Sequence, residues 1–452
     1  MGCDLVIDNA TLVGSRWQRQ ANLYVKDGKV VAVGQYECDS KERVDASGLF
    51  ALPGAIDPHV HLMDPGYTHV EQFETGTGAA AVGGTTTVVE HHRTDPQVLN
   101  VQVLTEKAAY LADKGLVDYA LFGGVEPDNL DQIEPMWHAG ASAFKAFTCN
   151  LHGVQGVFAA EMLEAFTILA HLGAPILVHA EDETMIARNA RLLHDEGRTD
   201  AGVILAWRTR AAEQVAVSTV ARLALLSGAK VIIAHASHPA VVEIIAHARA
   251  QGADLWCESC PQYFYLDEEE ILAHGPWRKF TPPARDRQAA EQLWGCLKRG
   301  QIHVINSDHA PATREDKAKG EQDIWAAPFG VPGIETRLPL MLNGVNEGKI
   351  SLQNVVRVTA ENNAKLYGLY PRKGCLLPGS DADVVLVDMN RRWTVKQSAI
   401  VSKVGWSPYE GRTLQGKPLM TFVRGQLVAQ EGNVVGQAGV GAYIPGPGLN
   451  PA

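Results

Sequence analysis

Eight apolar, strand-like runs alternate with helical segments between residues 53 and 371, and this alternation limits the chain to few folds. The segments that separate the runs are rich in Ala, Leu and Glu, as in AAEMLEAFTILAHLG. Strands that alternate with helices predict parallel βαβ units, and eight such units predict a (β/α)8 TIM barrel of the α/β class. The eight runs are ALPGAIDPHVHL, TTTVVEHH, VDYALFGG, SAFKAF, APILVHAE, AKVIIAHAS, ADLWCES and IHVINSDHA.

The two ends of the chain have a different texture, with short strands joined by tight turns. Asp27-Gly28 separates two strand-like runs near the N-terminus and is a hairpin signal. Arg424-Gly425 stands at a similar turn near the C-terminus. We therefore expect one small β-sandwich domain built from residues 1–52 and 372–452, beside a barrel formed by residues 53–371.

Composition narrows the possible partners. The formal net charge is −11 and 46% of the 452 residues are hydrophobic. These values predict a sizeable core and argue against a nucleic acid or an anionic membrane as a partner. No apolar run has the length of a membrane span and the first residues lack a signal-peptide pattern, so we expect a cytoplasmic protein. The seven cysteines are scattered and odd in number, which predicts reduced thiols, including the CxxC pair of Cys257 and Cys260.

Residues able to bind a metal stand at the ends of five predicted strands. In a barrel the carboxyl ends of all strands open on one face, where active sites are built. Taken singly, each residue has an ordinary explanation, such as a hydrogen-bonded structural histidine or a helix cap in the SDH tripeptide. Taken together they predict a metal site. The residues are His59 and His61 on the first strand, Lys145 on the fourth, His179 on the fifth, His235 on the sixth and Asp308 on the eighth.

Lys145 needs a special explanation, because it lies between Phe144 and Phe147 in a run that otherwise indicates a buried strand. An ammonium group is costly to bury without a partner. Apolar surroundings lower the pKa of an amine, and a neutral amine can add carbon dioxide to form a carbamate. Two metal ions could share the two carbamate oxygens. The alternative is a lysine that extends its amine to the surface.

The combination of an HxH pair, a strand-four lysine, two later histidines and a late SDH resembles the cyclic amidohydrolases of the amidohydrolase superfamily. This group contains hydantoinase/dihydropyrimidinase, allantoinase and dihydroorotase. The resemblance covers essentially the whole chain and includes GLFALPGAIDPHVH, ETGTGAAAVGGTTT, CESCPQYFYLD and GIETRLPLML. It implies metal-dependent hydrolysis of a ring C–N bond in a small cyclic amide or ureide, a barrel with a β-sandwich from both termini, and a homotetramer.

The same resemblance implies a binuclear centre, usually zinc, with a hydroxide that bridges the two ions. Asp308 would be catalytic as well as a ligand, because it would accept the proton of the attacking hydroxide and deliver it to the leaving ring nitrogen. One ion would be held by His59, His61, carboxylated Lys145 and Asp308, and the other by Lys145, His179 and His235.

Departures from the subfamily patterns help to sort the candidate substrates. Dihydroorotases typically carry Arg two residues after HxH, where this chain has Met63. Dihydropyrimidinases and D-selective hydantoinases usually carry Tyr five residues after the bridging lysine, where this chain has Asn150. The long run IWAAPFGVPGIETRLPLMLNGVNEGKISL resembles the L-type hydantoinases, with allantoinase next and dihydroorotase or a cyclic-imide hydrolase after it. The family also implies ring contacts near Ser259, Thr281, Phe329 and Gly330. Together with Met63, Arg93 and Asn150, these residues form the expected substrate-binding set.

The stretch EHHRTDP fits none of these groups, since an apolar residue, Pro and Asn are usual after strand two. His91, His92 and Arg93 could bind an anionic substituent of the substrate, or could pair with nearby acids or a neighbouring subunit. Two other classes resemble the chain less well. Non-catalytic dihydropyrimidinase-like scaffolds lack the metal ligands, and mononuclear deaminases of the superfamily do not use a carboxylated strand-four lysine.

Overall fold

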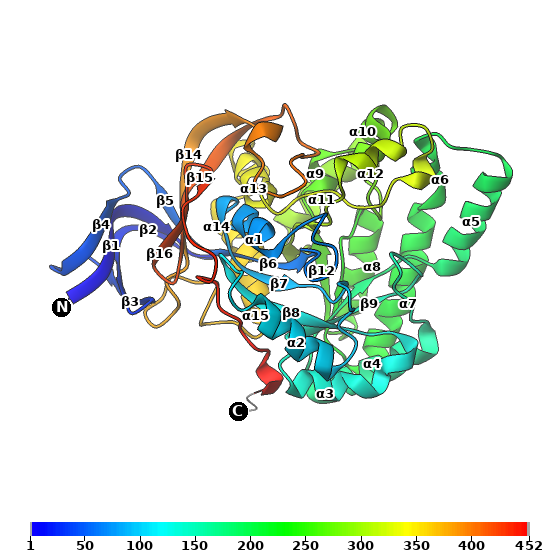
Figure 1. The fold of residues 1–452 in the computed structure, drawn as a ribbon, viewed down its shortest axis with the longest axis horizontal. Helices are drawn as coiled ribbons and strands as arrows, with labels where there is room; N and C mark the ends of the chain where they lie inside the picture. The colour runs from blue at the N-terminus through cyan, green and yellow to red at the C-terminus, as the bar shows by residue number, and fades with distance from the viewer. Residues whose placement is uncertain (1, 450–452) are drawn as a thin grey trace.

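The computed structural model describes residues 2–449 and consists of a barrel beside a sheet domain (Figure 1). Eight parallel strands pair in the order β13-β12-β11-β10-β9-β8-β7-β6, and a parallel bridge between Val60 and His309 joins the two edges. The predicted fold class is confirmed, because each predicted run contains one strand. The strands are β6 (Ala55–Val60), β7 (Thr85–Glu90), β8 (Asp118–Gly124), β9 (Ala143–Phe147), β10 (Ile176–His179), β11 (Val231–Ile233), β12 (Leu255–Ser259) and β13 (Val304–Ile305).

Helices cover the outside of the barrel (Figure 1). Local sequence fixes where they begin and end. In α7 the Thr209 hydroxyl accepts a hydrogen bond from Ala212 N, and Gly228 ends the helix in the left-handed conformation. The main helices are α1 (Phe73–Val82), α2 (Val101–Leu111), α3 (Ile133–His138), α4 (Ala159–Leu172), α5 (Glu183–Asp195), α6 (Gly202–Trp207), α7 (Arg210–Ser227), α8 (Pro239–Ala250), α9 (Gln262–Tyr265), α10 (Glu268–His274), α11 (Arg287–Lys298), α12 (Arg314–Lys319), α13 (Arg337–Asn346), α14 (Leu352–Val356) and α15 (Asn362–Leu366).

Two hydrophobic layers hold the barrel together, and strand alternation separates them. Ile176 and Val178 of β10 belong to the layer between strands and helices, whereas Leu177 belongs to the cluster inside the barrel. Successive residues of a strand point to opposite faces, so one strand contributes to both layers. Ala143 of β9 and Ile232 of β11 also belong to the inner cluster.

Strands from both termini form the second domain. Nine strands join in one sheet with the order β17-β16-β15-β14-β5-β1-β2-β3, and β4 pairs with β1. Asp27-Gly28 and Arg424-Gly425 have positive φ and form the two expected hairpin turns. The strands are β1 (Gly2–Val13), β2 (Gln18–Lys26), β3 (Lys29–Gly34), β4 (Asp39–Asp45), β5 (Phe50–Pro53), β14 (Val384–Thr394), β15 (Thr413–Val423), β16 (Gln426–Gln430) and β17 (Asn433–Val434).

The last described residues leave the sheet domain and return to the barrel. Ile444 N donates a hydrogen bond to Tyr119 O at 2.7 Å, and Gly446 N donates to Gly140 O at 2.9 Å. This segment ends near α3 (Figure 1). The domain boundaries at 52/53 and 371/372 stay predictions, and residues 1 and 450–452 of the predicted sheet domain lie outside the described residues.

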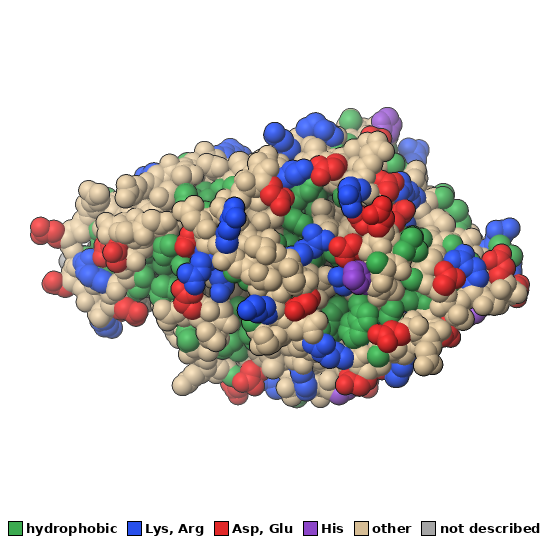
Figure 2. Space-filling view, turned by 90° about the horizontal axis from the view of Figure 1, so that it is seen from above, with side chains coloured by type: hydrophobic (Ala, Val, Ile, Leu, Met, Phe, Trp, Pro, Cys, Tyr) green, Lys and Arg blue, Asp and Glu red, His purple; other side chains and the backbone are tan. Residues whose placement is uncertain are grey.

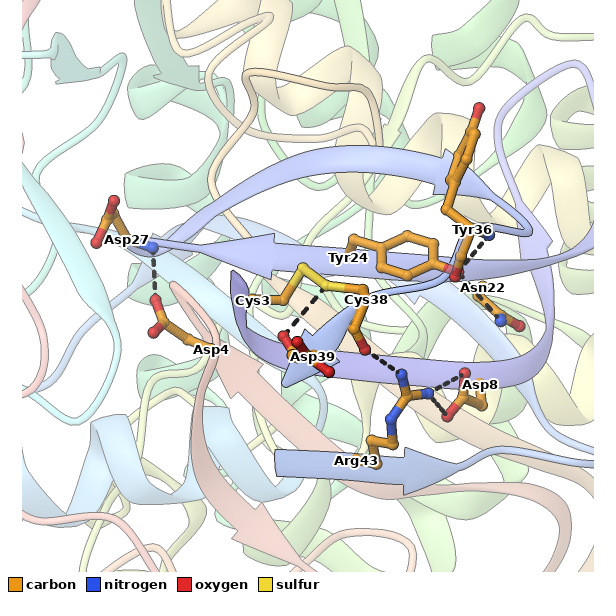
Figure 3. Close-up of a disulfide and its surroundings, with 10 residues drawn as sticks. All are labelled: Cys3, Asp4, Asp8, Asn22, Tyr24, Asp27, Tyr36, Cys38, Asp39 and Arg43. Carbon is orange, nitrogen blue, oxygen red and sulfur yellow. Dashed lines mark hydrogen bonds and ion pairs between the residues drawn. A yellow bond between two sulfur atoms is a disulfide. The ribbon is translucent and has the colours of Figure 1, made fainter. Parts of the chain in front are cut away.

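The expectation that all seven cysteines are reduced thiols is wrong. Cys3 and Cys38 form a disulfide in the sheet domain (Figure 3). Cys3 of β1 lies opposite Ser40 of β4, so the parallel pairing of these strands brings the two thiols together. Arg43 Nη2 donates a hydrogen bond to Cys38 O at 2.6 Å (Figure 3). The number of cysteines carries no information on strand register, so it could not predict this disulfide. The expected free thiols of Cys257 and Cys260 are confirmed, and both are buried.

The surface carries charges of both signs. Basic and acidic side chains are interspersed over the face that Figure 2 shows. Within residues 2–449 no helix combines the length and the apolar character that crossing a membrane requires.

Candidate metal centre

Strand alternation aims Lys145 and His179 into the mouth of the barrel. Ala143 of β9 belongs to the inner cluster, so Lys145, two residues later, points to the same face. Leu177 of β10 also belongs to that cluster, and His179 follows at the same spacing. Both side chains line a cavity at the carboxyl ends of the strands.

The other four predicted ligands lie at strand ends or just after them, and they line the same cavity. His59 is in β6 and His61 follows that strand. His235 and Asp308 follow β11 and β13 with φ of 39° and 48°. Left-handed backbone is uncommon for residues with a side chain and concentrates at functional sites. These two turns direct an imidazole and a carboxylate toward one space.

His59 connects two acidic side chains. Its Nδ1 lies 2.6 Å from Glu258 Oε1, and its Nε2 lies 3.2 Å from Asp308 Oδ1. His61 Nε2 is 3.9 Å from the same Asp308 oxygen. Asn306 Nδ2 donates to Glu258 Oε2 at 2.6 Å and so fixes that carboxylate. A carboxylate on one ring nitrogen sets the tautomer and orientation of the ring, which leaves His59 Nε2 as the atom able to bind a metal.

A second imidazole–carboxylate pair lies on β10. His179 Nε2 is 2.8 Å from Glu181 Oε2, and His179 Nδ1 is 2.9 Å from His235 Nε2. Arg208 Nη1 lies 3.0 Å from Glu181 Oε2, and the Thr281 hydroxyl donates to that oxygen at 2.7 Å. Burial opposes ionisation of Glu181, but Arg208 and His179 outweigh it and hold its pKa at about 2. This carboxylate therefore orients His179 with Nδ1 toward His235.

Lys145 is a buried cation that forms no ion pair within the described residues. Its side chain is almost completely buried, and its Nζ lies 5.0 Å from the centre of the Phe147 ring. Among the described residues, none accepts a hydrogen bond from this amine. Burial lowers the pKa of Lys145 to about 8, although the nearby Glu258 and Asp308 favour the charged form. A fraction of the amine is therefore neutral near pH 7, as the apolar flanks predict.

The donor atoms fit divalent metal ions. Burial lowers the pKa of His61, His179 and His235, so these imidazoles are neutral, as metal binding requires. The buried Nδ1 atoms of His61 and His235 have no hydrogen-bond partner within residues 2–449. Imidazole nitrogen and carboxylate oxygen suit zinc and similar ions. The cavity is therefore a candidate metal centre.

His91 supplies a donor that the predicted ligand set does not include. Its ring stacks on His59 with centroids 4.6 Å apart and lies 4.5 Å from the ring of His61. Potential ligand atoms of these three histidines all lie within 4.8 Å of one another. Burial holds the pKa of His91 well below its usual range, so the ring is neutral. This packing against two predicted ligands accounts for the burial of His91, and a neutral ring is a poor anion site.

The other two residues of the basic cluster, His92 and Arg93, differ in charge. Burial lowers the pKa of His92 to about 3, and neither of its ring nitrogens has a hydrogen-bond partner in the described chain. Arg93 lines the cavity and keeps its charge. Within residues 2–449 none of the three forms an ion pair with an acid, so the expected alternative of pairing with nearby acids finds no partner there.

The structure brings four of the seven predicted substrate residues into the cavity, namely Arg93, Thr281, Phe329 and Gly330. The other three do not line it in the described structure. Asn150 is exposed and its Oδ1 accepts from Gly156 N at 3.0 Å. The Ser259 hydroxyl donates to Ala236 O at 2.9 Å. Met63 is buried, with its Sδ 3.8 Å from Arg93 Nη2.

Both orienting acids and several wall residues lie outside the set that the sequence motifs predict. Glu181 stands two residues after His179, and Glu258 is an acid inside a buried strand, so pattern could have found both. His152 lies in a turn with φ of 57° and belongs to no motif, so its place in the wall was not detectable. The wall residues that were missed are Phe147, Leu151, His152, Phe280 and Ala310.

A larger groove lies away from this centre. It has a volume of about 840 Å³ and includes Glu335, Trp393, Lys396 and Lys417 in its walls. None of the six predicted ligands and no histidine contributes to the walls described for it. Size alone therefore does not identify the reactive site, and the donor chemistry favours the barrel mouth.

Comparisons with known proteins agree with this arrangement. The model of the Amidohydrolase family matches residues 50–428. The chain is 37% identical to L-hydantoinase of Paenarthrobacter aurescens over 449 residues, which are 98% of each chain. It is 33% identical to allantoinase of Escherichia coli over 436 residues, 95% of each chain. These matches confirm the resemblance that the motifs indicated.

Solved structures give the same result. L-hydantoinase (dihydropyrimidinase) from Arthrobacter aurescens superposes with a TM-score of 0.95 at 36% identity, over 98% of this chain and 100% of that one. Dihydropyrimidinase from Brevibacillus agri superposes with a TM-score of 0.91 at 31% identity, over 97% and 98% of the two chains.

Proposed function

The chain belongs to the amidohydrolase family, and from this premise we propose that it hydrolyses a C–N bond of a hydantoin-like ring. The product is an N-carbamoyl amino acid or a ureido acid. One observation carries the proposal: six residues of ligand type, far apart in the sequence, line one cavity at the barrel mouth. A non-catalytic scaffold does not need this set of donors, and a mononuclear deaminase does not use a carboxylated lysine at the position of Lys145.

The chain's own donors define how two divalent ions, most simply zinc, are held. His59, His61 and Asp308 would hold one ion, and His179 and His235 would hold the other. Lys145 would contribute carbamate oxygens to both, after its neutral amine adds carbon dioxide and releases a proton. The support for this step is the buried, unpartnered amine with a pKa of about 8. When bound, such ions lower the pKa of water and polarise the ring carbonyl.

Asp308 moves the proton during ring opening. Its carboxylate takes a proton from the attacking water and gives it to the ring nitrogen as the C–N bond breaks. Burial raises the pKa of Asp308, which makes it a better base than an exposed aspartate.

The positioning acids keep this arrangement aligned. Glu258 and Glu181 each hold one ring nitrogen of a ligand histidine, so the other nitrogen faces the ions. Phe280, Thr281, Phe329 and Gly330 form the wall against which the ring lies.

Allantoin hydrolysis is the second candidate function, because the chain is also 33% identical to allantoinase.

The proposal extends to location and assembly. We place the enzyme in the cytoplasm as a homotetramer that acts on a small molecule and binds neither nucleic acid nor membrane. Light scattering of the purified protein measures its mass, and a monomer would contradict the tetramer.

A turnover panel tests the function. Metal-replete protein is offered hydantoin, 5-substituted hydantoins, allantoin, dihydrouracil, dihydroorotate and simple cyclic imides, and the ring-opened products are quantified. We expect the hydantoins to be hydrolysed fastest, by protein that holds about two metal ions per chain. Full activity in a metal-free preparation, or no hydrolysis of any ring, would contradict the proposal.

A further inference from the structure

Arg93 is a positive charge in the wall of the cavity that the proposed reaction does not use. It follows β7 and lines the cavity together with His61, His152 and Asp308. A guanidinium group stays protonated under all ordinary conditions. Its Nε is buried without a hydrogen-bond partner, and its Nη2 contacts the Met63 sulfur at 3.8 Å. Within residues 2–449 no carboxylate lies close enough to form an ion pair with it.

An unpaired charge in such a place is costly. Partly desolvated charges lose hydration, and a counter-charge or charge-assisted hydrogen bonds must offset that loss. Asp308, the acid that lines the cavity with Arg93, forms no ion pair with it in the described structure and is itself a predicted metal ligand. Within residues 2–449 the protein therefore supplies no anion for Arg93.

The backbone around Arg93 is held in place before any ligand arrives. Lys107 Nζ donates to His91 O at 2.8 Å and lies 3.6 Å from Glu90. Glu90 in turn accepts a hydrogen bond from Leu62 N at 2.9 Å, which ties this segment to the one that carries Met63. On the other side, Val98 N donates to His92 O at 3.0 Å. A fixed donor loses little entropy on binding, so it binds an anion more tightly than a mobile one.

We propose that Arg93 binds a carboxylate carried by the substrate outside the reacting ring, so that the enzyme prefers cyclic amides with an acidic substituent. The inference rests on the proposed ring hydrolysis and names its substrate class. The planar guanidinium presents a fork of N–H donors that matches a carboxylate. Arg93 also shares the cavity with the predicted metal ligands His61 and Lys145, so an anion on Arg93 lies beside the reacting ring.

Two substrates of nearly equal size separate charge from shape. Hydantoin-5-acetate and hydantoin-5-acetamide differ by one oxygen in place of an NH2 group. We expect kcat/KM of the metal-replete enzyme to be at least about tenfold higher for the acetate, the scale of a hydrogen bond to a charged group. Arg93→Met should lower kcat/KM for the acetate by about 10- to 100-fold and leave the acetamide within about threefold. Arg93→Lys should keep part of the preference.

Arg191→Met is the matched control, because Arg191 is an exposed arginine of α5 outside the cavity. This variant should leave kcat/KM unchanged for both substrates. Equal loss on both substrates in Arg93→Met would overturn the inference and mean that Arg93 acts on the ring or on the new carboxylate. If the wild-type enzyme opens neither ring, the proposed function fails instead. Calorimetric binding of the two compounds then tests the inference, which requires tighter binding of the acetate and loss of that difference in Arg93→Met.

Discussion

Two buried lysines show how differently this molecule treats the same charge. Lys145 in the cavity and Lys373 at the junction of barrel and sheet domain are each about 1% exposed. Lys373 Nζ lies 2.7 Å from Asp118 Oδ2, 3.1 Å from Asp381 Oδ2 and 2.6 Å from Asp383 Oδ2. Lys145 has no such partner in the described chain.

The comparison separates a structural cation from a reactive one. Asp118 belongs to β8 of the barrel, whereas Asp381 and Asp383 precede β14, so Lys373 joins the two domains. Three carboxylates that lie close together would suggest a cation site, but the ammonium of Lys373 already pairs with all three, and Lys29, Arg372 and Arg424 supply further positive charge. The amine of Lys145, which has no such partner in the described chain, lowers the stability of the fold. This loss is explained if the amine reacts with carbon dioxide to form the carbamate.

Replacement of Lys145 should have the largest effect and tests one side of the comparison. Lys145→Ala should fold normally, bind metal poorly and lose all measurable activity, because the bridging carbamate cannot form. Propionate or acetate added with metal should refill the space and restore some activity. Turnover and metal content of the purified variant are the measurements.

Lys145→Arg is the matched control for that rescue. A guanidinium cannot take up carbon dioxide and still occupies the space, so added acids should not restore activity. A map or mass spectrum of the active, metal-loaded enzyme that shows an unmodified ammonium at Lys145 would refute the reactive role.

Asp308→Asn should have the next largest effect. The amide cannot accept the proton of the attacking water, so kcat should fall by about two to four decades while the fold is kept. Turnover at fixed metal occupancy measures this, since it separates proton transfer from metal loss. Near-normal turnover would assign the proton to another residue.

Lys373→Met tests the structural side. It leaves Asp383 as a buried carboxylate without its ammonium, while Asp118 keeps only Arg424, so the free energy of unfolding should fall by about 3–5 kcal/mol. Activity per folded molecule should be unchanged. Lys365→Met is the matched control, because Lys365 is 42% exposed and pairs with Glu361 at the surface, where such pairs contribute at most about 1 kcal/mol. Equal unfolding free energies in both variants would remove the contrast.

The sequence predicted those parts of the fold and site that depend on local pattern. Eight strand runs, two hairpin turns and six ligand-type residues follow from alternation, turn residues and spacing along single strands. Lys145 could be identified because a charge inside AFKAF breaks an apolar run. These features can be predicted because each depends only on residues that lie close together in the sequence.

Features that depend on pairing between distant segments could not be predicted. The disulfide requires β1 and β4 to pair in one register, which brings Cys3 to Cys38. The position of Asn150 depends on a turn in which its side chain accepts from Gly156, and spacing from Lys145 does not encode that turn. His152 enters the wall through the same irregular turn. No periodicity encodes these contacts.

The pH dependence of reactivation should be the smallest effect and sharpens the comparison further. Burial lowers the pKa of Lys145 to about 8, so its amine is mostly protonated below that pH and only the neutral fraction can add carbon dioxide. At fixed dissolved carbon dioxide and zinc, the initial rate at which metal-free enzyme regains activity should rise about tenfold per pH unit up to pH 8 and then level off. The propionate rescue of Lys145→Ala is the control, because that acid is already ionised over this range and should give no such rise. If both rates rise alike, the titration belongs to another group and the low pKa of Lys145 does not control the modification.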